Sequence, residues 1–196
     1  MIPTDPIERF RDVYALAKKI DRSILPDPSA MTLATVDQHG RPSVRVVLLK
    51  AFDELGFVFY TNYEGRKGRE LLSHPRAALC FYWPTIDIQV RVEGPVIRVT
   101  DGEADAYFAS RHRMSQIGAW ASRQSEPLEN PSALDERVRR YENEFAGKDV
   151  PRPAHWSGFR VQPERIEFWK EKPNRLHERH LYTHGGHGWK VETLYP

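Results

Sequence analysis

Apolar and polar residues alternate along much of the chain, in short runs that are bounded by turn residues. Such a period of two is typical of β-strands with one buried face. The segments Asp37–Gly40 and Gly185–Gly188 predict hairpin turns, and Gly94–Pro95 predicts a bend within a long strand. The predicted strands are Ala30–Val36, Ser43–Lys50, Gly56–Thr61, Arg76–Trp83, Ile86–Thr100, Gly158–Val161 running towards Trp169, Arg179–Tyr182 and Trp189–Leu194.

Helical spacing of apolar residues replaces this alternation in the remaining segments. From Ile7 to Ile20 they recur every three or four positions, after Asp5 as N-cap and Pro6 as first helical residue. Further helices are predicted at Glu64–Leu72, Glu103–Ser110, Met114–Ser122 and Ser132–Ala146. Consecutive strands with one helical insert predict an antiparallel α+β barrel. We expect a single domain over 1–196, with an N-terminal helix in 1–22, a helical insert at 101–146 and C-terminal strands at 157–196 that complete the barrel.

Composition narrows the class of protein. Apolar residues make up 40% of the chain, while 29 basic and 27 acidic residues leave a net charge of only +2. The near balance argues against a nucleic-acid partner, which a broad basic surface would attract. The single cysteine, Cys80, has no partner for an internal disulfide. No apolar run approaches the length of a membrane span, so we expect a cytoplasmic protein with no membrane partner.

The apolar strand at 43–50 carries two cations, Arg45 and Lys50. A strand this apolar is buried on both faces or lies at an interface. A buried cation needs an anion beside it. The pattern by itself slightly favours the simpler interpretation, in which Arg45 forms an ion pair and Lys50 marks the end of the strand.

Tyr60 and Thr61 end the next strand, and Arg66 and Lys67 follow at the start of a helix. A helix N-terminus offers free N–H groups and the positive end of the helix dipole. The two cations add charge, so the segment suits a phosphate monoester, although the glycine-lysine-serine/threonine ending of a Walker loop is absent. The alternative is a solvated basic helix face. The position of this segment directly after a strand favours a phosphate-binding site.

A second candidate phosphate site lies in the helical insert. Tyr107, Arg111 and Ser115 are spaced by four, so a continuous helix would place them on one face. Two hydroxyls and a guanidinium on one face suit a phosphate. The alternative is a surface helix with incidental polar residues. The segment Gln124–Ser125 that follows indicates by itself only a loop.

The C-terminal segment is the most informative. On a strand, Arg175, His177 and Arg179 would point to one face, with Leu176 on the other. With Trp169 nearby, these side chains suit a planar, anionic, aromatic ligand, because arginine stacks on flat rings and binds phosphate in a fork. The alternative is a polar strand face on the rim of a barrel.

No metal is expected, although histidines gather late in the chain at His177, His180, His184 and His187. The first two would lie on opposite faces of a strand, and the last two flank a glycine turn. Zinc sites usually add cysteine or carboxylate ligands at set spacings. The Gly-x-Ser-x-Gly motif is absent, so acyl transfer has no support.

Ile166-Glu167-Phe168-Trp169, followed by Arg175-Leu176-His177-Glu178-Arg179, resembles the signature of the pyridoxamine/pyridoxine 5'-phosphate oxidase family, whose members are FMN enzymes of vitamin B6 metabolism. The similarity runs from about Asp5 to Pro196. It implies a Greek-key split β-barrel with flanking helices, and a homodimer with FMN at the interface. Two features depart from the family. The longer N-terminal arm that often closes over substrate would be missing or truncated, and Lys170 stands where glutamine is commoner.

The resemblance assigns roles residue by residue. Arg66 and Lys67 would hold the FMN phosphate, Gln89 would reach the isoalloxazine edge, and Arg175 and His177 are the catalytic candidates. The residues implied to bind FMN are Arg45, Val46, Val47, Leu48, Leu49, Lys50, Tyr60, Thr61, Arg66, Lys67, Gln89, Gln124, Ser125, Trp169 and Arg179. The residues implied to bind the substrate are Lys50, Tyr107, Arg111, Ser115, Arg175, Leu176 and His177.

The implied activity is FMN-dependent oxidation of pyridoxine 5'-phosphate or pyridoxamine 5'-phosphate to pyridoxal 5'-phosphate, with O2 as electron acceptor and release of H2O2, and of NH3 from the amine. One alternative is a related flavin oxidase of another aromatic, such as a phenazine-pathway intermediate. Others are a non-catalytic split-barrel protein that binds flavin or pyridoxal phosphate, and an interaction module without a cofactor. The second phosphate site favours a B6 phosphate, and Arg175 with His177 favours an enzyme.

Overall fold

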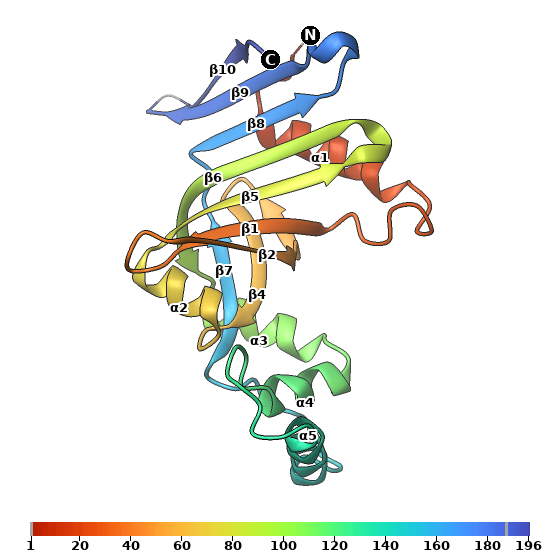
Figure 1. Ribbon diagram of the computed structural model, residues 1–196, viewed down its shortest axis with the longest axis vertical. Helices are drawn as coiled ribbons and strands as arrows, with labels where there is room; N and C mark the ends of the chain where they lie inside the picture. The colour runs from red at the N-terminus through yellow and green to blue at the C-terminus, as the bar shows by residue number, and fades with distance from the viewer. Residues whose placement is uncertain (1, 187) are drawn as a thin grey trace.

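The computed structural model describes residues 2–186 and 188–196, and it shows a strongly curved sheet with helices at its flank and at one end (Figure 1). The strands are β1 (Ala30–Val36), β2 (Pro42–Leu48), β3 (Ala51–Asp53), β4 (Gly56–Asn62), β5 (Arg76–Trp83), β6 (Ile88–Arg98), β7 (Trp156–Val161), β8 (Arg165–Lys170), β9 (Glu178–Gly185) and β10 (Gly188–Leu194). The helices are α1 (Pro6–Lys18), α2 (Arg66–Ser73), α3 (Asp101–Ala109), α4 (Arg113–Ala121) and α5 (Ala133–Glu144), with short 3-10 turns η1 (Pro84–Ile86) and η2 (Pro173–Arg175).

All the strand pairs are antiparallel, and β6 connects the two parts of the sheet. The strand order is β10-β9-β8-β6-β5-β1-β2, while β4 pairs with β3 and β7, and β7 returns to the far end of β6. Residues 88–93 of β6 pair with β8, and residues 96–98 pair with β7. The predicted antiparallel α+β barrel with flanking helices is therefore confirmed.

The change of partner within β6 depends on Gly94. A Cβ atom built on this residue would lie 1.8 Å from the carbonyl oxygen of Gln162, so only glycine lets the chain between β7 and β8 pass this closely. Pro95 follows at the bend, where its carbonyl oxygen accepts from the N–H of Gln162 over 2.9 Å. The bend predicted from Gly94–Pro95 is where β6 passes from one partner to the next.

Local signals fixed the first helix as predicted. The side chain of Asp5 accepts hydrogen bonds from the backbone N–H groups of Ile7 and Glu8, and Pro6 is the first helical residue. Phe10 then reaches the core of the sheet, where its ring centroid lies 4.9 Å from those of Phe52 and Phe57. The helix therefore covers the inner face of the barrel, as Figure 1 shows for α1 behind β5 and β6.

The strand predicted at Arg179–Tyr182 is confirmed, because β9 begins at Glu178, but Arg175 and His177 precede it and do not share a strand face with Arg179. Pro173 opens the turn η2, and Asn174 and Arg175 both adopt the left-handed region, with φ of 58° and 60°. Asparagine tolerates that region better than most residues, and proline pre-sets the first position of a turn. The short strand β3 was also missed, because three residues carry no readable alternation.

The helical insert α3 to α5 lies at the opposite end of the molecule from β9, β10 and the two chain ends (Figure 1). It has its own apolar cluster, in which Phe108, Ile117 and Phe145 pack against Trp156 at the start of β7. No described helix is both long and apolar enough to cross a membrane.

Candidate active site

A cavity of about 740 Å³ lies between β2, β4 and the helical insert. Its wall contains eleven of the side chains predicted for binding, which come from five separate segments of the chain. The predicted residues at the cavity are Val46, Val47, Leu48, Lys50, Tyr60, Thr61, Lys67, Tyr107, Arg111, Ser115 and Gln124. The cavity also contains five residues that sequence reasoning did not identify as ligands: Asn62, His112, Gly118, Ala119 and Ser122. Trp156 is a sixth.

One end of the cavity has the character of an anion site. Helix α2 begins at Arg66 after Gly65, whose backbone is extended and which supplies no capping side chain, and the N–H of Arg66 donates to Ser125 Oγ over 3.1 Å. Lys67 Nζ donates to Gln124 Oε1 over 2.9 Å and to Thr61 Oγ1 over 3.2 Å. Burial and the nearby Arg45 lower the pKa of Lys67. No carboxylate pairs with Lys67 among the described residues, so the charge is free to meet an anionic ligand.

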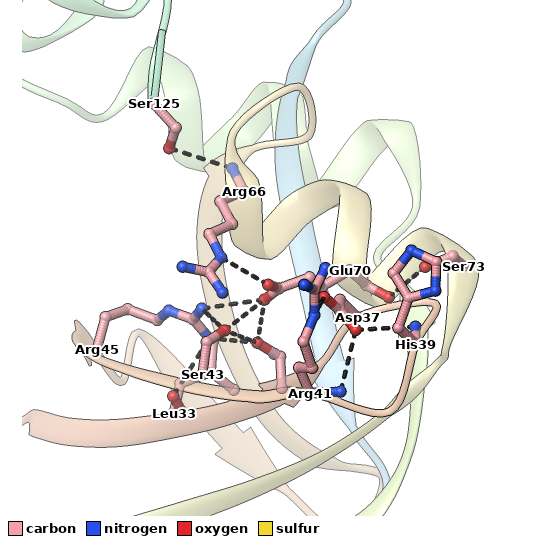
Figure 2. Close-up of polar contacts among 11 residues, drawn as sticks. Leu33, Asp37, His39, Arg41, Ser43, Arg45, Arg66, Glu70, Ser73 and Ser125 are labelled. Carbon is pink, nitrogen blue, oxygen red and sulfur yellow. Dashed lines mark hydrogen bonds and ion pairs between the residues drawn. The ribbon is translucent and has the colours of Figure 1, made fainter. Parts of the chain in front are cut away.

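Arg45 and Arg66 share one buried carboxylate, that of Glu70 (Figure 2). Arg45 Nη2 lies 3.0 Å from Glu70 Oε2, and Arg66 Nε lies 2.8 Å from Glu70 Oε1. The ion pair expected for Arg45 is therefore confirmed, and Lys50 follows the end of β2 as expected. Sequence reasoning missed Glu70, because a glutamate in the charged helix Arg66–Ser73 gives no sign that it is buried.

The other end of the cavity holds a stack of aromatic rings with an arginine beside it. Tyr60 and Tyr107 stack at 4.0 Å between centroids, and Tyr60 is nearly parallel to Trp156 at 5.5 Å. The guanidinium carbon of Arg111 lies 4.6 Å from the ring centroid of Trp156. Burial lowers the pKa of Arg111, and its Nη1 is a buried donor with no hydrogen-bond partner in the described chain. A buried cationic donor of this kind is suited to a ligand that supplies the missing acceptor.

The continuous helix considered for Tyr107, Arg111 and Ser115 is absent, because α3 ends at Ala109 and α4 begins at Arg113. The break follows from His112, which takes a non-helical conformation and caps α4 by accepting from the N–H of Met114. All three predicted residues nevertheless line the cavity. The fold therefore brings them together across a turn rather than along one helix face.

Six of the remaining predicted residues form a second cluster, away from this cavity: Gln89, Trp169, Arg175, Leu176, His177 and Arg179. Gln89 pairs with Trp169 across β6 and β8, and Trp169 pairs with Arg179 across β8 and β9. The ring of His177 lies 4.5 Å from that of Trp169. Arg175 and Leu176 are exposed beside them, and Arg175 has no hydrogen bond or ion pair to any residue from 2 to 186 or 188 to 196.

One outer sheet face connects the two clusters. Directly paired strand residues point to the same side, so Val46, Thr32, Cys80 and Arg91 form one row across β2, β1, β5 and β6. Gln89, Trp169 and Arg179 lie on that face as well, because Val90 between Gln89 and Arg91 is fully buried. Val46 is 66% exposed and also lines the cavity, and β2 is an unpaired edge of the sheet. An apolar edge strand of this kind is a surface for another chain.

Two of the predicted FMN residues are less accessible. Leu49 is buried in the main core, and its N–H donates to the carbonyl oxygen of Ser29. The side chain of Arg45 is held at the edge of the sheet by its ion pair with Glu70. His187 lies outside the described residues, and no group of three His, Cys, Asp or Glu side chains in the described part of the chain is close enough to hold a metal ion.

Comparisons with known proteins show the family. The profile of the family described as pyridoxamine 5'-phosphate oxidase matches residues 17–170, and that of the pyridoxine 5'-phosphate oxidase C-terminal dimerisation region matches residues 156–196. A pyridoxine/pyridoxamine 5'-phosphate oxidase of Myxococcus xanthus is 60% identical over 196 residues, which is 100% of this chain and 94% of that protein. The same enzyme of Rubrobacter xylanophilus is 55% identical over 98% of this chain and 87% of its own.

Two solved structures are similar to the whole chain. PhzG from Burkholderia lata, in complex with tetrahydrophenazine-1-carboxylic acid, is 30% identical with a TM-score of 0.89, covering 99% of this chain and 94% of that one. A pyridoxamine 5'-phosphate oxidase-related FMN-binding protein from Nostoc punctiforme shares the fold, at 19% identity and a TM-score of 0.76, with 100% of both chains covered. The profile matches and the identities of 55–60% show that the chain belongs to the pyridoxamine 5'-phosphate oxidase family of oxidoreductases.

Proposed function

We propose that the chain oxidises pyridoxine 5'-phosphate or pyridoxamine 5'-phosphate to pyridoxal 5'-phosphate with FMN as cofactor and O2 as electron acceptor, releasing H2O2, and NH3 from the amine. The observation that carries the proposal is the unpartnered Nη1 of Arg111 in a cavity that also holds Lys50, Tyr107 and Ser115. Two cations and two hydroxyl donors around one cavity match the oxygens of a phosphate monoester.

The residues at the start of α2 fit the phosphate of FMN. The exposed guanidinium of Arg66, the ammonium of Lys67 and the open N-terminus of the helix provide positive charge and donors at one place. Thr61 and Gln124 hold Lys67 there. When bound, FMN supplies the redox chemistry, accepting a hydride from the substrate and passing electrons to O2.

The position of the second cluster supports a homodimer with FMN at the interface. Arg175, His177, Trp169 and Arg179 lie on or beside the outer sheet face that reaches the cavity through Val46. We infer that a second copy packed on this face brings its own cluster to the cavity of the first. The match of residues 156–196 to a dimerisation region supports this arrangement.

In the dimer, the chain's own residues would bind and orient the substrate. Lys50, Arg111 and Ser115 would hold its phosphate, far from the carbon that reacts. Arg175 is exposed and unpaired in the described chain, so its guanidinium is free to stack on the pyridine ring and hold that carbon in place. His177, which lies beside Trp169, would exchange a proton with the polar groups on the pyridine ring of the substrate.

The experiment that tests the proposal is an anaerobic stopped-flow mix of the FMN-loaded protein with pyridoxine 5'-phosphate. We expect bleaching of the flavin absorbance, followed by recovery when air is admitted and by formation of pyridoxal 5'-phosphate. A flavin that stays oxidised with both B6 phosphates would exclude the proposed activity. Reduction by a phenazine precursor in that case would favour the phenazine-type oxidase, to which the similarity with PhzG also points.

A further inference from the structure

Glu70 is among the most deeply buried charged residues of the described chain, although it belongs to a short helix rich in charge. Its side chain is 6% exposed, and four side chains donate to it. Oε2 accepts from Thr35 Oγ1, from Ser43 Oγ over 2.8 Å and from Arg45 Nη2 over 3.0 Å. Among the described residues, Oε1 accepts only from Arg66 Nε, over 2.8 Å. The carboxylate therefore joins α2 to the edge of the sheet at β1 and β2.

The two arginines on this carboxylate have different freedom. Arg45 is 19% exposed, and both of its terminal nitrogens are engaged, Nη1 with Leu33 O and Thr35 Oγ1, and Nη2 with Ser43 Oγ and Glu70. Arg66 is 60% exposed and is held only through Nε. Its two terminal nitrogens have no hydrogen bond to any described residue, and Figure 2 draws no contact from them to the other residues shown.

We propose that Glu70 is a positioning residue for the cofactor phosphate: by fixing Nε of Arg66, it turns the two terminal N–H groups of that guanidinium towards the phosphate of FMN. The inference rests on the proposed function, in which Arg66 is a phosphate ligand. A guanidinium binds a phosphate best in a fork of two parallel hydrogen bonds. Orienting the fork in advance reduces the conformational entropy that Arg66 loses when the cofactor binds.

The charges around Glu70 support a positioning role over a purely electrostatic one. Three cations, Arg45, Arg66 and Lys67, lie close together at this point of the fold, and Glu70 is the acidic side chain that pairs with two of them. A carboxylate near a phosphate opposes binding by its charge alone. The presence of Glu70 beside a proposed anion site is therefore explained by the side chains that it holds in place. Hydrogen bonds to the charged form outweigh the effect of burial, which by itself would raise the pKa of Glu70.

The test compares FMN with riboflavin, which lacks the phosphate. Each flavin is titrated into the flavin-free 196-residue protein, and quenching of flavin fluorescence gives the Kd. The ratio of the riboflavin Kd to the FMN Kd measures what the phosphate contributes. The variants are Glu70→Ala, Glu70→Gln and Arg66→Ala, and each Glu70 change is also made in the Arg66→Ala background. Glu64→Ala is the matched control, because Glu64 is an exposed glutamate just before α2 that forms no ion pair with Arg66.

We expect Glu70→Ala to lower the ratio about 10-fold, the loss of roughly one charge-assisted hydrogen bond, with the riboflavin Kd unchanged. Glu70→Gln should lower the ratio less, because its single carbonyl oxygen can still accept from Arg66 Nε. In the Arg66→Ala background neither change should lower the ratio further. Glu64→Ala should leave the ratio as in the wild type or raise it slightly.

Three results would overturn the inference. Equal weakening of FMN and riboflavin would mean that Glu70 only supports the fold. A further loss in the Arg66→Ala background would mean that it does not act through Arg66. An unchanged ratio in both Glu70 variants would remove it from the site. If the wild type does not prefer FMN, the proposed phosphate site is wrong, and if Arg66→Ala leaves the ratio unchanged, Arg66 is not a phosphate ligand. Should Glu70→Ala not fold, Glu70→Gln with its double variant decides between the same outcomes.

Discussion

Replacing Arg111 by methionine tests the proposed substrate-phosphate site in two opposite directions. In the protein without substrate, Nη1 of Arg111 is a buried donor that no described residue satisfies. Such a donor costs about 1–3 kcal/mol. The cation–π contact with Trp156, at 4.6 Å, offsets part of this by roughly 0.5–2 kcal/mol. Methionine removes the donor and keeps a sulfur–aromatic contact of about 0.3–1.5 kcal/mol.

The variant should therefore be more stable and less active. A net gain of about 1 kcal/mol corresponds to a rise in Tm of about 2–4 °C for a domain of this size. Loss of one charge-assisted hydrogen bond to the phosphate, about 1.5–3 kcal/mol, corresponds to a KM that is about 10- to 100-fold higher. Thermal unfolding of the substrate-free protein gives the first quantity, and steady-state formation of pyridoxal 5'-phosphate gives the second.

Arg113→Met is the matched control. Arg113 lies outside the cavity and donates to the carbonyl oxygens of Phe145 and Lys148, where it satisfies acceptors at the end of α5. The same substitution there should lower the Tm and leave the KM unchanged. If Arg111→Met instead lowered the Tm and left the KM unchanged, Arg111 would serve the packing of the helical insert, and the reasoning from its unpartnered nitrogen would be refuted.

Three further predictions follow from other parts of the structure. Arg175→Ala should lower kcat/KM by about 100-fold, from a lost transition-state contact of about 3 kcal/mol, while FMN stays bound; loss of flavin absorbance after gel filtration would contradict the assigned role. Gly94→Ala should lower the Tm, because its Cβ would lie 1.8 Å from the carbonyl oxygen of Gln162. An unchanged Tm would mean that β6 and the segment around Gln162 can move apart without loss of stability. The pKa of Glu70 is lowered from 4.5 to about 2, so its stabilising contribution is complete above pH 4.5 and is lost as the pH falls towards 2. Urea unfolding across that window should show the wild type losing stability faster than Glu70→Gln, and parallel curves would contradict this.

Local patterns in the sequence determined most of the elements. The Asp5 cap with Pro6 fixed the start of α1, and Gly94–Pro95 marked the bend in β6. These signals act through neighbouring residues, so they can be read without knowledge of the fold. The common strand face considered for Arg175, His177 and Arg179 is absent, because Asn174 and Arg175 take left-handed backbone conformations that alternation of residue types cannot reveal.

The candidate site was predictable by residue type and less so by arrangement. Arg66, Lys67 and Arg111 were identified from charge and spacing, together with the resemblance to the family. Trp156 was missed as a lining residue because an aromatic at the start of a strand usually packs in the core. Glu70 was missed because burial depends on Thr35, Ser43 and Arg45, which come from strands distant in the sequence.

The sequence by itself determined the class of fold, the helix and turn positions, and which side chains have the chemistry to bind phosphates and an aromatic ring. Only the tertiary structure decided that these side chains form two separate clusters, one around the cavity and one on β6, β8 and the start of β9. It also decided that Arg45 is bound within the sheet edge while Arg66 stays free to meet a ligand. The physical reason is that pairing between strands distant in sequence, such as β6 with β8, sets these distances, and no local pattern encodes such pairing.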